Sequence, residues 1–376
     1  MKNLVYILLI FLFSACVNKS NTASSASSSS IDTLNVAYAT GFDIYYHENY
    51  KQIDIYSPWQ KNEILQRLYL VADPSTETPA DGNKITIPLQ SIAISSCTHT
   101  EFIQFLNEVN TVKGVCTPHL IYNSNIRNLY ADGAIISLGD AHNVNIEQLV
   151  HLRPDVYWVS SYNQQDEQAK RLQQNGVNIA YNNEWTESSL LARAEWLKFM
   201  AAFYDKEELA DSIFAAIEHD YLEASKIAQS VEKRPTVMAG GNFKGTWYMP
   251  SGASYMGRMF ADAGADYFYA NDSSTTTSIA LNFETVLTAF YDADVWLNAP
   301  TQSINALMQM DSRHNLFRSA REGNVFGFYA RTLSTGANDF WESGVAHPDL
   351  VLKDIIWALH PNLLLDYQPS YIIKLD

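Results

Sequence analysis

Two Cys/His pairs are the residues of this sequence whose types and spacing could bind a metal. Cys97 and His99 follow one short apolar strand candidate, and Cys116 and His119 follow the next one along the chain. Consecutive strands of a parallel sheet can end at the same edge, so the two pairs could meet there. Thiolate and imidazole ligands suit zinc or haem iron. Because the tight Cys-x-x-Cys spacing is absent, three alternatives stay open: a metal or haem site, a Cys97–Cys116 disulfide, or four unrelated residues.

A second group of residues, mostly aromatic, falls in loops that follow predicted strands. In α/β lobes such loops converge on the ligand site. Aromatic rings bind by stacking and an arginine by charge-assisted hydrogen bonds, so this group predicts a large, flat or anionic ligand. Core packing is the alternative for each aromatic residue, and a surface salt bridge is the alternative for the arginine. The candidate ligand contacts are Arg331, Trp185, Trp247, Tyr248, Trp341 and Tyr162.

The start of the chain has the pattern of a secretion signal that ends in a lipidation site. A basic start and a short apolar run lead to Phe13-Ser14-Ala15-Cys16, which resembles the bacterial lipobox with Phe13 in place of the usual leucine. The apolar run is about half the length needed to span a bilayer, so we expect residues 1–15 to be removed as a signal peptide and Cys16 to be lipidated. The Ser-rich segment 16–31 is expected to be a flexible tether. A secreted protein with an unmodified cysteine is the alternative.

Composition and missing motifs argue against several classes of function. A formal net charge of −16 disfavours nucleic acid and anionic lipid as partners. The chain has no Gly-x-Ser-x-Gly elbow, no phosphate-binding Gly-Lys-Thr loop and no His-Glu-x-x-His zinc motif. Gly240-Gly241-Asn242 follows a predicted strand but lacks the third glycine and the helix start of a nucleotide loop. We therefore expect no enzymatic activity and no nucleic-acid partner.

The alternation of short apolar strands with helices predicts an α/β fold. We expect two doubly wound α/β lobes with mainly parallel sheets. The segment between the lobes carries apolar residues at helical spacing without a strand signal. We expect one long helix that joins the lobes, with a helix pair broken near Asp205 as the alternative. The expected regions are a small β-rich N-terminal appendage at 32–90, an N-terminal lobe at 91–186, the inter-lobe helix at 187–231 and a C-terminal lobe at 232–376.

One pattern occurs in both halves of the chain. Residues 145–159 and 282–297 each run from a helix that opens with a carboxylate, through a turn, into a buried strand. This duplication resembles the solute-binding proteins of ABC importers, in the cluster that carries iron–siderophores, cobalamin and haem. The resemblance covers most of residues 91–376. It implies that Glu147 and Glu284, at matching positions, pair with arginines of a permease. Helix capping alone is the alternative for both glutamates.

The resemblance also implies a function. The protein would be a lipid-anchored, extracytoplasmic carrier in the periplasm that binds its ligand in an inter-lobe cleft and delivers it to an ABC permease and its ATPase. A ferric siderophore is the leading ligand, with cobalamin or haem as alternatives, and no resident cofactor is implied. We expect a monomer. The competing classes are an exported enzyme and a structural or adhesive lipoprotein without a cleft.

Overall fold

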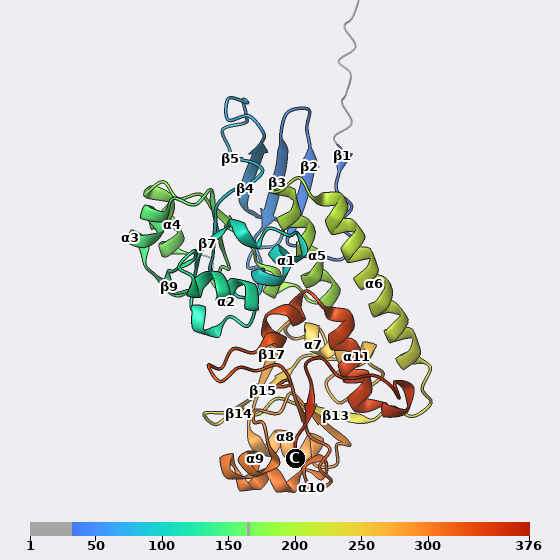
Figure 1. Cartoon of the computed structure of the whole chain (residues 1–376). Coiled ribbons are helices and arrows are strands. Elements are labelled where there is room, and N and C mark those ends of the chain that lie inside the picture. The colour runs from blue at the N-terminus through green and yellow to red at the C-terminus, as the bar shows by residue number, and fades with distance from the viewer. Residues whose placement is uncertain (1–31, 164–165) are drawn as a thin grey trace, which may run out of the picture. The chain divides into compact units, whose positions relative to one another are not determined.

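The structure of this chain is a computed structural model that describes residues 32–163 and 166–376 (Figure 1). The predicted signal peptide, Cys16 and the tether lie outside the described residues. Residues 32–376 pack as one unit. Within the described ranges no helix is both long and apolar enough to cross a membrane.

Residues 32–90 contain a five-stranded sheet in the order β1-β2-β3-β4-β5. Its strands are β1 (Asp32–Thr33), β2 (Phe42–Tyr46), β3 (Lys51–Tyr56), β4 (Ile64–Val71) and β5 (Asn83–Thr86). Neighbouring strands are antiparallel except β4 and β5, which are parallel. Alternate apolar residues such as Phe42, Ile44, Ile53 and Ile55 are buried, because successive side chains of a strand point to opposite faces.

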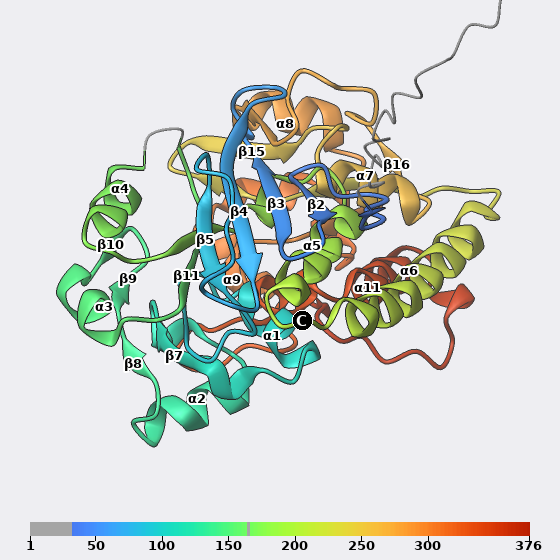
Figure 2. The same ribbon diagram turned by 90° about the horizontal axis from the view of Figure 1, so that it is seen from above.

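This sheet shares a hydrophobic core with the N-terminal lobe. The Gln66 side chain of β4 donates to the backbone oxygen of Ile179 (2.7 Å) and accepts from the backbone N–H of Tyr181 (3.1 Å). These two bonds hold β4 beside the edge strand β12 of the lobe. The buried face of the sheet lies against helix α5 (Leu190–Ala202), as Figures 1 and 2 show, with Phe42 packed on Trp196.

The N-terminal lobe is built on a parallel sheet in the order β12-β11-β6-β7-β8, which confirms the predicted strand–helix alternation. Its strands are short apolar runs, as expected where helices cover both faces of a sheet. They are β6 (Ile92–Ile94), β7 (Val112–Val115), β8 (Ile136–Ser137), β11 (Val156–Val159) and β12 (Ile179–Tyr181). The helices are α1 (His99–Phe105), α2 (Ser124–Ala131), α3 (Ile146–Leu152) and α4 (Glu167–Gln174). A small hairpin is formed by β9 (Gly139–Asp140) and β10 (Asn143–Val144).

The inter-lobe segment forms two helices, α5 and α6 (Glu207–Gln229), and not the one long helix that we expected. The break lies near Asp205, which adopts a positive φ of 54° and so cannot continue a right-handed helix. Every residue of α5 is buried, including Arg193, Glu195 and Lys198. Buried charges need partners, so these three side chains mark contacts that hold other elements in place.

The C-terminal lobe has a smaller parallel sheet, ordered β16-β13-β18, and a separate antiparallel sheet, ordered β14-β15-β17. The parallel strands are β13 (Thr236–Ala239), β16 (Asp266–Tyr267) and β18 (Val295–Leu297), and the antiparallel ones are β14 (Asn242–Phe243), β15 (Thr246–Pro250) and β17 (Ser278–Leu281). A short pair, β19 (Phe326–Gly327) and β20 (Ile373–Lys374), lies near the chain end. The helices are α7 (Tyr255–Asp262), α8 (Phe283–Phe290), α9 (Ile304–Met310), α10 (Arg318–Arg321) and α11 (Pro348–Leu359). After β13 the chain turns at Gly240, with φ of 72°, into the β14–β15 hairpin and not into a helix, so this glycine pair does not begin a nucleotide loop.

Candidate functional site

A cavity of about 850 Å³ lies where the N-terminal sheet, the end of the N-terminal lobe and the C-terminal lobe meet. This volume is in the range of small-molecule binding sites. Its lining is rich in aromatic rings, hydroxyl groups and amides. The lining residues are Thr40, Gly41, Tyr56, Ser57, Pro58, Trp59, Lys61, Asn183, Trp185, Thr186, Glu187, Gly240, Tyr248, Pro250, Ser254, Tyr255, Met256, Thr276, Thr277, Ser278, Asn298 and Trp341.

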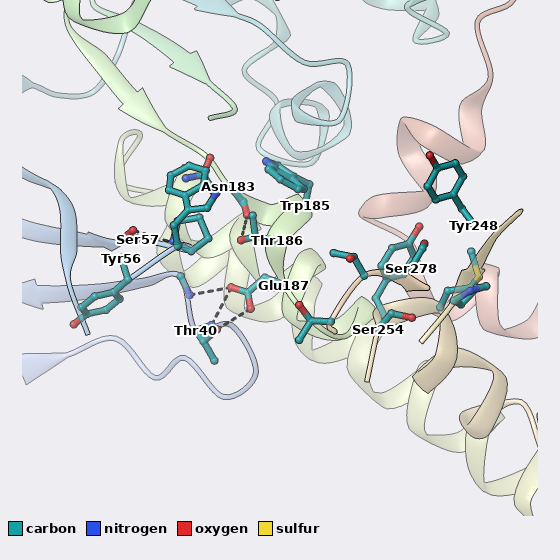
Figure 3. A pocket seen from close by; sticks show the side chains of 18 of the residues that line it. Thr40, Tyr56, Ser57, Asn183, Trp185, Thr186, Glu187, Tyr248, Ser254 and Ser278 are labelled. Atoms are coloured by element: carbon teal, nitrogen blue, oxygen red, sulfur yellow. Dashed lines mark hydrogen bonds between the residues drawn. The ribbon is translucent and has the colours of Figure 1, made fainter. Parts of the chain in front are cut away.

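Three of the predicted ligand contacts line this cavity: Trp185, Tyr248 and Trp341. Tyr56 and Ser57 lie on one side of the site, Trp185 in the middle and Tyr248 on the other side (Figure 3). The Tyr248 and Trp341 side chains are 52% and 46% exposed, so both rings are accessible to a ligand in the cavity. Tyr162 does not line the cavity, but its ring packs on Trp185 with centroids 5.4 Å apart.

The prediction for Trp247 is wrong, because its side chain is fully buried in the core of the C-terminal lobe. Its indole N–H donates to the backbone oxygen of Ala239 (2.8 Å), and its ring packs on Trp296. Trp247 and Tyr248 are consecutive in β15 and therefore point to opposite faces of the sheet. Only Tyr248 reaches the cavity.

Arg331 also lies away from the cavity, contrary to the prediction. It lines a second, polar cavity of about 450 Å³ together with Tyr122 of the N-terminal lobe. Its guanidinium pairs with the buried carboxylate of Asp339 (Nε–Oδ2 2.9 Å) and lies 5.4 Å from the centre of the Tyr122 ring. The charge that made Arg331 a candidate is therefore neutralised within the protein.

A buried ion pair positions the two sides of the site. Glu184 lies in a short 3-10 turn (Glu184–Thr186), and its carboxylate is 3.6 Å from the guanidinium of Arg193 in α5. Burial raises the pKa of Glu184, and the charge of Arg193 opposes this shift. The same guanidinium lies 5.1 Å from the ring centre of Tyr255, the first residue of α7. Glu184, which precedes Trp185, and Tyr255, on the opposite lobe, thus contact the same arginine.

A second buried carboxylate joins the lobes. Glu342 of the C-terminal lobe accepts hydrogen bonds from the backbone N–H groups of Tyr122 (2.6 Å) and Asn123 (2.8 Å) and from the Thr100 hydroxyl (2.8 Å). Burial raises the pKa of Glu342 to about 7, although all three donors oppose the shift. The Glu342 contacts fix the spacing of the lobes around the cavity.

The Cys/His pairs do not form a common site. Cys97 and Cys116 do follow neighbouring parallel strands, β6 and β7, but both are free thiols and no disulfide joins them. Burial raises the pKa of Cys97 to about 12 and that of Cys116 to about 11, which disfavours the thiolate that metals bind. His119 lines a separate cavity near Leu333. Among the described residues no group of three or more His, Cys, Asp or Glu side chains could hold a metal ion.

His99 is fully buried at the start of α1, and within the described ranges neither ring nitrogen has a hydrogen-bond partner. Burial lowers its pKa from 6.5 to about 3. Below pH 6.5 the unfolded chain therefore takes up a proton that the folded protein does not. As the pH falls further, this residue lowers the free energy of unfolding by about 1.4 kcal/mol for each pH unit. We expect the variant His99→Leu to gain about 2 kcal/mol relative to the unmodified protein between pH 6.5 and pH 5. Urea unfolding at both pH values measures this, and parallel pH profiles would contradict the assignment.

Residues 32–90 provide a part of the site that was not predicted from the sequence. Residues 35–41, here called the strap, cross α5, and their backbone N–H groups bind its carboxylates. The N–H groups of residues 37–39 donate to Glu195 (2.7–2.9 Å), and those of residues 40 and 41 donate to Glu187 (2.9 Å). Glu187 also accepts from the Trp196 indole (3.0 Å). Figure 3 shows its carboxylate between the strap and the cavity.

The two glutamates of the repeated pattern occupy equivalent positions. Glu147 lies in the first turn of α3, where the Asn145 side chain caps Gln148 N–H (3.0 Å), and Glu284 lies in the first turn of α8, where Asn282 caps Thr285 N–H (2.8 Å). Helix α3 belongs to the N-terminal lobe and α8 to the C-terminal lobe, far apart in Figure 1. Asparagine side chains, not the glutamates, cap both helices. The glutamate side chains are exposed and free to meet a partner, apart from a 3.5 Å contact of Glu284 with Arg313 that is open to solvent.

Two relatives are uncharacterized lipoproteins of Methanocaldococcus jannaschii. One is 26% identical over 301 residues, covering 77% of this chain and 70% of the relative, and the other is 23% identical over 382 residues, covering 94% and 93%.

Solved structures share the fold at low sequence identity. A periplasmic haem-binding protein from Pseudomonas aeruginosa is 15% identical with a TM-score of 0.54, over 75% of this chain and 95% of that one. The petrobactin-binding protein of Bacillus subtilis is 14% identical with a TM-score of 0.54, over 72% and 92%. Residues 97–328 match the family described as periplasmic binding protein. The match spans both lobes, and the chain belongs to the periplasmic binding protein family.

Proposed function

We propose that this protein is the extracytoplasmic substrate-binding component of an ABC importer and that it captures a metal chelate in the 850 Å³ cavity. The observation that carries the proposal is the lining of this cavity, where the partly exposed ring of Trp185 from the N-terminal lobe and the exposed rings of Tyr248 and Trp341 from the C-terminal lobe line a space of the right size for such a ligand. Membership of the periplasmic binding protein family supports the transport role. The names of two structural neighbours, which bind haem and petrobactin, support the ligand class.

The charges around the cavity favour a chelate of low net charge. Lys61 is the one basic residue among the lining residues of the described chain, and no arginine lines the cavity. The carboxylate of Glu187 is engaged by the strap. A ferric trihydroxamate siderophore and cobalamin each carry amide groups and little net charge. Either ligand could therefore stack on the aromatic rings of the cavity and form hydrogen bonds with its hydroxyl and amide groups. Haem suits the site less well, since its two carboxylates would share a single lysine.

We further propose that a lipid on Cys16 anchors the protein to the membrane that holds the permease. The two lipoprotein relatives support this anchor. A tether raises the concentration of the carrier near its permease without any new contact. The variant Cys16→Ser is expected to lose incorporation of labelled fatty acid and to leave the membrane fraction. Label retained on the variant would contradict lipidation at this residue.

The ligand is identified by titrating the purified protein separately with a ferric trihydroxamate siderophore, cobalamin and haemin. Quenching of intrinsic tryptophan fluorescence reports binding, because Trp59, Trp185 and Trp341 line the cavity. We expect saturable one-to-one binding of a low-charge chelate, with little dependence on salt because few ion pairs form. Failure of all three chelates to bind would overturn the proposed function.

A further inference from the structure

The N-terminal sheet contributes a third wall to the cavity, beside the walls from the two lobes. Residues 56–59 and Lys61, at the turn between β3 and β4, line the cavity together with Thr40 and Gly41 of the strap. The strap and this turn lie before residue 97, where the match to the family begins. The wall is therefore a feature of this chain in addition to the two lobes.

The turn is held in one conformation by its own hydrogen bonds. The Ser57 hydroxyl oxygen accepts from the backbone N–H groups of Trp59 (3.3 Å) and Gln60 (3.2 Å), and Ser57 N–H donates to Glu63 O (2.8 Å). The Tyr56 hydroxyl donates to Asp43 (2.7 Å). These bonds spare a ligand the entropic cost of ordering the turn.

The wall is also fixed to the rest of the protein through the strap. The backbone N–H of Tyr56 donates to the oxygen of Gly41 (2.8 Å), and Gly41 in turn donates to Glu187. A side chain at Gly41 would place its Cβ 2.5 Å from the Trp196 ring, so the strap approaches α5 as closely as glycine allows. The wall is thus fixed through the strap to Glu187 and to helix α5.

Two side chains of the wall are available to a ligand. Trp59 is partly exposed, and within the described ranges its indole N–H has no protein acceptor. Lys61 is exposed and, in the described part of the chain, forms no ion pair. The aromatic face of Trp59 suits a chelate with a flat or apolar face. The indole N–H of Trp59 and the ammonium of Lys61 suit a carbonyl or a single anionic oxygen at the edge of that chelate.

We infer that the β3–β4 turn is a substrate-contacting wall, in which Trp59 stacks on the bound chelate and Lys61 binds an oxygen at its edge. This inference rests on the proposed function and assigns residues 32–90 a role in substrate selection. It accounts for the polar anchoring of the strap, since a wall that moved freely could not select among ligands.

The test compares Trp59→Ala with a matched control, Tyr50→Ala. Tyr50 is a partly exposed aromatic residue in the turn between β2 and β3 of the same sheet, and it does not line the cavity. The ligand is a ferric trihydroxamate, or cobalamin if that is the chelate which the unmodified protein binds. We expect Trp59→Ala to raise Kd by about tenfold or more, Trp59→Phe to restore most of the affinity, and Tyr50→Ala to leave Kd within about twofold. Lys61→Glu should weaken binding more than Lys84→Glu, an exposed lysine of the same sheet outside the cavity.

A second measurement does not depend on the folding of any variant. Hydroxyl-radical footprinting of the unmodified protein should show that the bound chelate protects Trp59 from oxidation and leaves Tyr50 unprotected. Unchanged affinity in Trp59→Ala, or oxidation of Trp59 that the ligand does not alter, would overturn the wall while the proposed function stands. An unmodified protein that binds neither of these chelates nor haemin would instead overturn the proposed function itself.

Discussion

Replacing Glu147 and Glu284 together by alanine is expected to reduce uptake of the chelate at least about tenfold while leaving the affinity of the purified protein unchanged. The two carboxylates lie in equivalent first turns of α3 and α8, one on each lobe. Neither residue lines the ligand cavity. Two charges at a fixed separation on a rigid body set the orientation of docking to a partner with matching positive charges, so their loss should affect delivery and not capture.

The measurement is accumulation of the labelled chelate by cells whose only copy of the gene carries the variant, together with Kd of the purified protein. A matched control is Glu167→Ala combined with Glu208→Ala, which removes the same charge from first turns of two other helices, α4 and α6. Undiminished uptake in the Glu147/Glu284 variant, or an equal loss in the control, would refute specific docking.

Replacing Glu195 by alanine is expected to lower the free energy of unfolding by about 3 to 5 kcal/mol, the cost of removing one partner from a buried charged group. The Glu195 carboxylate is fully buried, accepts from three backbone N–H groups of the strap and lies 3.2 Å from the ammonium of Lys198. Alanine leaves these donors without an acceptor in a site that water does not reach. The strap should detach from α5, and the third wall of the cavity with it.

Urea unfolding measures the loss, and Kd for the chelate measures the effect on the wall. Glu195→Gln keeps an oxygen acceptor and should lose less stability than alanine. Glu223→Ala is a suitable control, since among the residues that the structure describes this exposed glutamate of α6 pairs only with Lys226, at 3.4 Å, and such pairs contribute little. A Glu195→Ala protein as stable as the control would show that the strap does not depend on this carboxylate.

The lobes could be predicted from the sequence because their signals are local. A strand buried on both faces is a continuous apolar run, such as Val156–Val159, and the helix that precedes such a strand in each half opens with a capping residue, Asn145 or Asn282. The expected single inter-lobe helix is two helices instead, because the backbone of Asp205 adopts a positive φ that interrupts it.

The site was predicted only in part because its geometry depends on contacts distant in sequence. Strand alternation shows that Trp247 is buried and that Tyr248 faces the cavity, but this alternation can be applied only when the bounds and the buried face of β15 are known. Arg331 was chosen for its charge, and nothing in the sequence indicates that Asp339 neutralises it. The wall from residues 32–90 depends on Gln66 binding the edge of β12 and on two glutamates of the inter-lobe segment, pairings more than 100 residues apart in the chain.

The most direct test of the central claim is a calorimetric titration of the purified protein with a ferric trihydroxamate siderophore and with cobalamin, repeated on a variant that carries Trp185→Ala and Tyr248→Ala. These two rings come from different lobes and lie on the same cavity (Figure 3). We expect one-to-one binding of a low-charge chelate by the unmodified protein and a loss of affinity of about a hundredfold in the variant, about 2.7 kcal/mol. Binding of equal strength in both proteins, or no binding of either chelate to the unmodified one, would contradict this expectation.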